Sequence, residues 1–99
     1  MNIETLVHVK KVDEGIVGLE VSLPNAPPLL LIKGSRGFIM CGYLNISVAD
    51  KLGLAAARVV GVRTVEDMLE KNIVEVTAKA RELGIKEGMK VREALKFIV

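Results

Sequence analysis

Aromatic residues are scarce in this 99-residue chain, which holds two Phe, one Tyr and no Trp. Its core must therefore be built from aliphatic side chains. The only cysteine, Cys41, excludes an internal disulfide and is typical of a reducing cytoplasm. The longest uncharged stretch, residues 37–49, is too short to span a bilayer, and residues 1–11 lack the apolar core of a signal peptide. The sequence therefore predicts a cytoplasmic protein with no membrane association.

An excess of one charge sign is also missing. The formal net charge is +2, and basic residues of the second half are interleaved with acids, as in Glu75 with Lys79 and Glu82 with Lys86. This i,i+4 spacing is typical of a solvated helix face. Proteins that bind single-stranded nucleic acid combine a basic groove with stacking aromatics, and both are scarce here. Nucleic acid is therefore not an expected partner.

Glutamine is absent, whereas Glu and Lys supply nine residues each. Few thermolabile amides and many Glu and Lys residues are typical of a thermophile's protein. The hydrophobic fraction is 51% and the mean hydropathy is +0.40, which is high for a small chain with a large surface to cover. We therefore expect some apolar surface to be buried against other copies of the chain.

The first half of the chain shows strand patterns. Residues 3–23 predict a β-hairpin, because alternating runs flank the turn residues Asp13-Glu14-Gly15. The prolines of residues 24–28 are expected to break the ladder, so a third strand is predicted only over residues 29–33. After a tight turn at residues 34–37, Phe38 to Cys41 predicts a fourth strand, buried on both faces in the middle of the sheet.

The second half changes to helical spacing. Residues 47–50 resemble a capping box and predict a short helix that ends before Gly53. Residues 57–62 predict a fifth, buried strand. Residues 64–67 repeat the capping pattern and open a helix that runs through Leu69.

Two further helices are predicted near the C-terminus. Apolar residues follow the 3–4 spacing of a helix from Ile73 to Leu83, and Gly84 with Ile85 indicates a Schellman ending. A last amphipathic helix is expected to bury four residues of one stripe, namely Val91, Ala94, Leu95 and Ile98.

These elements predict an α+β fold, or alternatively a mixed α/β sheet. A β-rich N-terminal half of about five strands would be covered by three to four helices from the C-terminal half. A chain of this length is expected to form a single domain, in which residues 1–33 are the β-rich oligomerisation region and residues 34–99 the strand–helix body. Because natural proteins cover exposed strand edges, we expect a homotetramer, or alternatively a homodimer.

Cys41 and Gly42 are the first candidates for chemistry. They stand at the end of a buried strand just before a helix, where ligands bind in sheets of this kind and where a thiol is activated. The alternative is that Cys41 is a small buried apolar residue. The only histidine, His8, is far away in sequence and is expected on the surface or at an interface. One Cys and one His do not complete a metal site, so neither a metal nor a cofactor is expected.

Two arginines are candidate receptors for a small anionic ligand. Arg36 lies in the turn of residues 34–37, whose backbone N–H groups suit an anion, although most turns of this kind only join two strands. Arg63 and Thr64 stand where the fifth strand leads into a capped helix, beside free helix N–H groups. The alternative for Arg63 is an ion pair with a carboxylate such as Glu66 or Asp67.

Several short motifs of the chain occur in a family-specific order: Gly37-Phe38-Ile39-Met40-Cys41-Gly42, Gly61-Val62-Arg63-Thr64, Leu83-Gly84-Ile85, Gly88-Met89 and Arg92-Glu93-Ala94-Leu95. In these motifs residues 37–95 resemble the YunC-like family of bacterial and archaeal domains of unknown function. The N-terminal part resembles the family only in its β-rich pattern. The resemblance implies a small domain whose N-terminal sheet region serves tetramerisation, with no assigned activity and no catalytic residues.

Two functions are open at this point. The first is an interaction or scaffold protein that assembles through its N-terminal strands and has no chemistry of its own. The second is a small anionic-metabolite binding protein or enzyme, with a site around Cys41, Gly42, Arg63 and Thr64 that Arg36 or His8 of a neighbouring subunit completes. One pocket surrounded by these residues would favour the second function, and a Cys41 sealed in apolar packing would favour the first.

Overall fold

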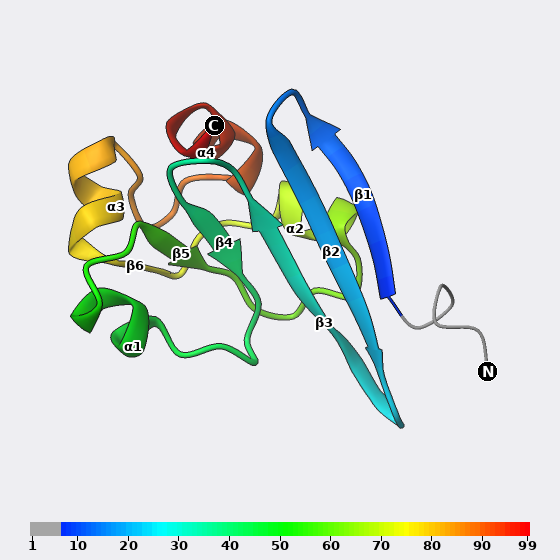
Figure 1. Cartoon of the computed structure of the whole chain (residues 1–99). Coiled ribbons are helices and arrows are strands. Elements are labelled where there is room, and N and C mark those ends of the chain that lie inside the picture. The colour runs from blue at the N-terminus through cyan, green and yellow to red at the C-terminus, as the bar shows by residue number, and fades with distance from the viewer. Residues whose placement is uncertain (1–6) are drawn as a thin grey trace.

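The computed structural model describes residues 7–99, which form a six-stranded sheet in the order β1-β2-β3-β4-β5-β6 (Figure 1). The strands are β1 (Val7–Asp13), β2 (Ile16–Leu23), β3 (Ala26–Lys33), β4 (Phe38–Met40), β5 (Ala56–Arg58) and β6 (Glu75–Val76). All neighbours are antiparallel except β4 and β5, which are parallel. Parallel strands need a crossover connection, and the segment that contains the first helix supplies it. The sheet is mixed and the helices follow the main strands, so the predicted α+β class is confirmed.

The described residues also form four helices, namely α1 (Ile46–Lys51), α2 (Val65–Glu70), α3 (Ala78–Leu83) and α4 (Val91–Ile98). The main core includes Ile32 and Ile39 of the sheet, Met68 of α2 and Leu95 of α4. A second, smaller cluster joins Met40, Ala49 and Ala56 beside α1. Because successive strand residues point to opposite faces, α1 covers the face of the sheet opposite to α2 and α4. Among the described residues, no helix is both long and apolar enough to cross a membrane.

The predicted hairpin is confirmed for residues 7–23, and residues 3–6 of the prediction lie outside the described part of the chain. β1 and β2 pair from Val7 opposite Val21 to Asp13 opposite Ile16. On the helix side of β2, Gly18 is buried. A Cβ atom at Gly18 would lie 2.7 Å from Cγ1 of Val65. The missing side chain therefore allows the start of α2 to pack directly against the hairpin.

The third strand begins three residues earlier than predicted. Pro24 and Asn25 form the turn, where Asn25 has a φ of 55°, and β3 starts at Ala26. The prediction treated all of residues 24–28 as a break because proline lacks an N–H. Pro27 and Pro28 are nevertheless part of the strand, because β4 pairs only with Leu31 to Lys33 and the ladder to β2 shifts register near the turn.

The first helix and the fifth strand also differ from the prediction. α1 begins at Ile46 with Asn45 as its N-cap, whose side chain accepts a hydrogen bond from the Ser47 N–H. Ser47 itself is therefore not the cap. β5 spans residues 56–58 instead of 57–62, because the chain after Val59 leaves the sheet. The predicted cap of α2 is confirmed, since the Thr64 side chain accepts from the Asp67 N–H.

The helix predicted from Ile73 is wrong in its first five residues. Residues 75–76 form β6, and α3 begins only at Ala78. The N-cap Thr77 is buried, and its hydroxyl donates to the Leu54 carbonyl at 2.7 Å while it accepts from the Ala56 N–H at 3.0 Å. These bonds hold the residues before α3 to the edge of the sheet. The apolar spacing that predicted one helix from Ile73 therefore covers β6 as well as α3.

The end of α3 is as predicted. Gly84 adopts a left-handed φ of 112°, and the Ile85 N–H donates to the Ala80 carbonyl at 3.1 Å, which completes a Schellman motif.

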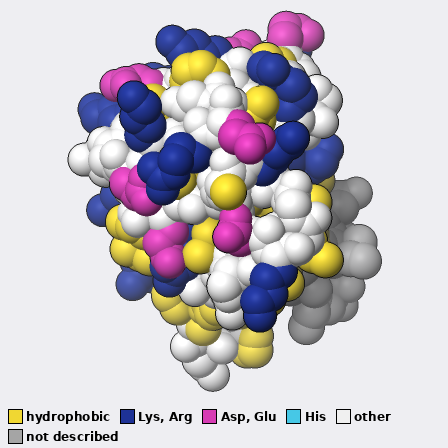
Figure 2. Space-filling model, turned by 90° about the vertical axis from the view of Figure 1, so that its left-hand side faces the viewer, with side chains coloured by type: hydrophobic (Ala, Val, Ile, Leu, Met, Phe, Trp, Pro, Cys, Tyr) yellow, Lys and Arg dark blue, Asp and Glu magenta, His cyan; other side chains and the backbone are white. Residues whose placement is uncertain are grey.

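Charges of both signs are interspersed on the side of the molecule where α3 lies (Figure 2). α3 carries the pair Lys79–Glu82 at 3.7 Å, and Arg81 pairs with Glu87 at 2.8 Å. Glu75 is on β6, where it pairs with Arg58 of β5, so the predicted helical pair with Lys79 is wrong. The surface here is mixed in charge, as the interleaved sequence indicates.

Candidate functional site

A pocket lies at the carboxyl ends of the parallel strands β4 and β5. The Val59 N–H donates to the Met40 carbonyl at 3.0 Å. One further rung of the parallel ladder would join the Gly42 N–H to the Val59 carbonyl, and this bond does not form within residues 7–99. The chain therefore leaves β4 and β5 in different directions, and the space between the two exits is the pocket.

Three segments line this pocket, which has a volume of about 310 Å³. They are Pro27 and Pro28 of β3, residues 41–43 after β4, and Gly61 with Val62 after β5. The Tyr43 hydroxyl donates to the Pro27 carbonyl at 2.7 Å, which connects the first two segments. Gly61 has a φ of 70°, a conformation that glycine adopts without strain and that turns the third segment.

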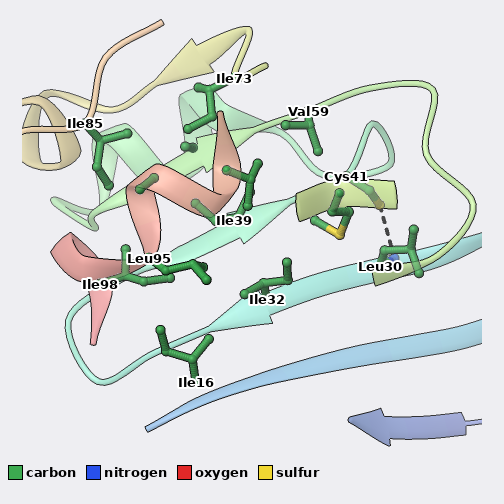
Figure 3. Close-up of a cluster of buried hydrophobic side chains, with 14 of the residues drawn as sticks. Ile16, Leu30, Ile32, Ile39, Cys41, Val59, Ile73, Ile85, Leu95 and Ile98 are labelled. Carbon is green, nitrogen blue, oxygen red and sulfur yellow. Dashed lines mark hydrogen bonds between the residues drawn. The ribbon is translucent and has the colours of Figure 1, made fainter. Parts of the chain in front are cut away.

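The Cys41 thiol belongs to the core as well as to the pocket wall. Its residue is 2% exposed and is part of the main apolar cluster. The Leu30 N–H donates to Cys41 Sγ at 3.3 Å, as Figure 3 shows. His8 lies on β1, three strands from β4 and thus about 14 Å away at the usual strand spacing. The fold therefore does not bring Cys41 and His8 of one chain together.

Arg63 and Thr64 follow the pocket residues but do not line the pocket. The Arg63 N–H donates to Asp67 Oδ2 at 3.2 Å, and Thr64 Oγ1 accepts from the Asp67 N–H at 2.9 Å. Both contacts organise the first turn of α2. The Arg63 side chain is exposed, and its link to Asp67 is through the backbone rather than through the guanidinium.

Arg36 lies at the amino end of β4, opposite to the pocket. Its side chain donates to the Val99 carbonyl at 2.9 Å and to the Lys96 carbonyl at 3.2 Å, and its N–H donates to the Ile98 carbonyl at 2.8 Å. Arg36 thus caps the C-terminus of α4, where free carbonyls favour a cation. It also lines a separate groove of about 420 Å³ between β3 and the loop after α1.

The structure thus brings Cys41 and Gly42 together with Gly61 and Val62, and it leaves Arg36 apart. The two prolines, Tyr43, Gly61 and Val62 are pocket residues that the sequence did not indicate. One usable signal was present, since a glycine follows each of the two central strands. Within residues 7–99, no group of three or more His, Cys, Asp and Glu side chains is placed to hold a metal ion.

Three comparisons relate this chain to known proteins. Residues 40–98 match the family described as "Domain of unknown function (DUF1805)". The chain is 42% identical over 79 residues to the uncharacterized protein YunC of Bacillus subtilis (strain 168), which covers 76% of this chain and 77% of that protein. It is also similar to the crystal structure of a protein of unknown function, TA1206, from Thermoplasma acidophilum, with a TM-score of 0.84 and 36% identity over 94% of this chain and 91% of that one. The pocket residues 41–43 and 61–62 lie within the family match, whereas β1 to β3 precede it.

Proposed function

The chain belongs to the YunC-like family of domains of unknown function, and we propose that it is an interaction protein that assembles with copies of itself. In this proposal the assembly is a homotetramer formed through β1, β2 and β3, and the protein acts as a scaffold rather than as a catalyst. The observation that carries the proposal is an apolar sheet face whose β1 and β2 part no described helix covers, while its β3 edge, at Leu31, packs against the smaller cluster beside α1.

This outer sheet face is the side of β1 to β3 that points away from α2 and α4. The register aligns Val7 with Val21, Val9 with Leu19, and Leu19 with Leu31. With Val17 two positions before Leu19 on β2, the outer sheet face holds six aliphatic residues: Val7, Val9, Val17, Leu19, Val21 and Leu31. Lys11 of β1 and Lys33 of β3 stand opposite Val17 and end the apolar part of the face there. Aliphatic side chains in adjacent cross-strand positions form one continuous apolar surface.

Three residues of the outer sheet face are open to solvent in the isolated chain, whereas Leu19, Val21 and Leu31 are half-buried. Val9 is 69% exposed, and Val7 and Val17 are also exposed. Figure 1 shows α2 behind β2 and β3, while α1 lies beside the β4–β5 end of the sheet. Soluble monomers rarely leave a contiguous apolar patch of this kind uncovered. A second copy that presents the same face would cover it by a two-fold contact.

A tetramer needs a second contact surface, and two further features supply candidates. β1 is an edge strand whose outer side pairs with no strand of the described chain, and such edges are usually covered. The groove between β3 and the loop after α1 extends the apolar surface through Phe38, Leu44 and Leu54. Two different two-fold contacts combine into a dimer of dimers.

The alternative function is a small anionic-metabolite site, with or without catalysis, around Cys41, Gly42, Arg63 and Thr64. Its two cationic residues do not line the pocket, because Arg36 binds the end of α4 and Arg63 is exposed outside the lining. Cys41 is packed in the apolar core. These contacts favour the interaction role.

We also propose that this assembly works in the cytoplasm of a thermophile. The support is compositional, namely the single unpaired cysteine, the absence of Gln and the nine Glu and nine Lys residues.

Sedimentation of the full chain tests the assembly. We expect a species of four times the chain mass of 10.7 kDa at micromolar concentration. Val9→Lys places a charge on the most exposed part of the outer sheet face, and burying an unpaired charge is costly, so this variant should sediment as a smaller species. Val74→Lys is the matched control, because Val74 is also an exposed valine but lies between α2 and β6.

Two outcomes would contradict this proposal. A wild-type chain that sediments only as a monomer would show that it does not assemble. A Val9→Lys variant that assembles as well as Val74→Lys would show that the outer sheet face is not the interface.

A further inference from the structure

We propose that the pocket at the carboxyl ends of β4 and β5 binds a small, uncharged, apolar molecule through a carbonyl oxygen, which backbone N–H groups recognise. The inference does not depend on self-assembly. It rests on the hydrogen-bonding state of the lining backbone, on the chemistry of the lining side chains and on the position of the pocket in the sheet.

Five lining residues have backbone N–H groups that donate to no protein group within residues 7–99, namely Cys41, Gly42, Tyr43, Gly61 and Val62. Gly42 lacks its partner because the ladder between β4 and β5 ends one rung earlier. Val62 is only 7% exposed, and buried N–H groups without an acceptor are rare in folded proteins. The residues around the pocket therefore hold N–H groups that no acceptor in the described part of the chain satisfies.

The lining side chains determine the polarity of the ligand that the pocket can bind. They are the two prolines, the Cys41 thiol, the Tyr43 ring and Val62, and none of them is charged. A charged group that binds against such walls loses part of its hydration without gaining an opposite charge. An uncharged molecule with one acceptor loses much less, and a carbonyl oxygen accepts from N–H groups as backbone carbonyls do.

Size and position agree with a small-molecule site. A volume of about 310 Å³ is at the lower end of the range for such sites. Ligands of open sheets bind beyond the carboxyl ends of parallel strands, where the connections diverge. The β4–β5 pair is the parallel pair of the described sheet, and the pocket lies at its carboxyl end.

Gly42 allows the pocket to be blocked without disturbing the core. A Cβ atom there would contact only Cγ1 of Val60, at an ordinary 3.7 Å, and Gly42 is exposed and not in the left-handed region. A larger side chain at Gly42 is therefore compatible with the fold, whereas at Gly61 it would be strained by the φ of 70°. Gly42→Leu is the blocking variant, and Lys51→Leu on the exposed end of α1 is its control.

Amide NMR titration of the full chain with three probes of similar size tests the proposal. The probes are benzamide, benzoate and fluorobenzene. Benzamide should shift the amide resonances of Gly42, Tyr43, Gly61 and Val62, while the amides of Gly53 and Gly88 in distant turns stay unchanged. Benzoate and fluorobenzene should bind at least about fivefold more weakly than benzamide. Benzoate carries a charge, and fluorobenzene lacks the carbonyl oxygen that would accept the hydrogen bond. Gly42→Leu should abolish the benzamide shifts, and Lys51→Leu should keep them.

Each contrary result overturns a defined part of the inference. Benzamide shifts that are absent or scattered over the surface would show that the pocket is not a site. Tighter binding of benzoate would show that it takes an anion. Fluorobenzene binding as tight as that of benzamide would show that the N–H groups do not hydrogen-bond to the ligand. Because the wild-type titration decides these points, the inference is testable even if Gly42→Leu fails to fold.

Discussion

At the scale of single residues, packing decides the chemistry of the Cys41 thiol. The side chain lines the pocket, but the residue is 2% exposed and Sγ accepts the buried Leu30 N–H at 3.3 Å. Among the described residues, no Lys or Arg forms a hydrogen bond or ion pair with it. We therefore expect slow labelling by iodoacetamide at neutral pH in the native state and fast labelling in denaturant, measured by mass spectrometry over time.

A pair of variants distinguishes this structural role from a reactive one. Cys41→Ala removes the acceptor of the Leu30 N–H and should lower the free energy of unfolding by about 1–3 kcal/mol. Cys41→Ser keeps an acceptor oxygen and should lose less. Labelling of the native protein as fast as in denaturant would contradict the structural role and would favour the enzyme hypothesis.

At the scale of elements, α4 shows how one amphipathic helix supports the sheet. Val91, Ala94, Leu95 and Ile98 are buried as the spacing predicts, and Leu95 belongs to the main core. Leu95→Ala should lower the free energy of unfolding by about 2–5 kcal/mol, because apolar contact is lost and a cavity is left. Glu93→Ala on the exposed side of α4 is the control and should change stability by less than about 0.5 kcal/mol. Denaturant titration measures both, and a loss for Leu95→Ala as small as that of the control would contradict the assigned helix face.

At the scale of the whole molecule, a charged cluster joins the N-terminal hairpin to the helical half. Lys10 of β1 contacts Glu20 of β2 at 2.9 Å and Glu66 of α2 at 3.0 Å. Glu20 also accepts the Val65 N–H, at the first turn of α2, at 2.8 Å. The hydrogen bond from Lys10 lowers the pKa of the Glu66 carboxyl, and the hydrogen bond to Glu20 raises the pKa of Lys10.

These shifts predict a pH dependence of stability. A carboxyl with a lowered pKa in the folded state stabilises the fold above its unfolded pKa, and this contribution is lost as the pH falls through the folded value. Because Glu66 is largely exposed, the contribution should be about 0.2–1 kcal/mol and should decrease with salt. Glu66→Gln should therefore destabilise the protein at pH 7 and match the wild type well below the ordinary Glu pKa of about 4.3.

Thermal unfolding at several pH values measures this effect. Glu93→Gln, which changes an exposed carboxyl on α4, is the matched control. A Glu66→Gln variant that is as stable as the wild type at pH 7 in low salt would show that the cluster does not link the two halves energetically.

The sequence by itself determined the features that depend on neighbours within a few residues. The alternating runs and the turn of β1 and β2, the Thr64 cap of α2, the Gly84 ending of α3 and the buried face of α4 were all predicted. It also placed Cys41 and Gly42 at the end of a central strand. In each case the signal and the structure share the same short segment, since caps, turns and helix faces are formed by local hydrogen bonds and local spacing.

Only the tertiary structure decided the features that join distant segments. Thr77 forms hydrogen bonds with Leu54 and with Ala56 of the sheet. The predicted helix therefore begins only after Thr77, and residues 75–76 form β6 instead. Arg36 donates to carbonyls at the end of α4, about 60 residues later in the chain. The pocket is formed by β3 and by the segments that follow β4 and β5. Long-range pairing brings these groups together, and it depends on the order and register of the whole sheet. The physical reason is that hydrogen-bonding groups are satisfied by whichever partners the fold brings within reach, and spacing along the sequence does not encode which distant partners these are.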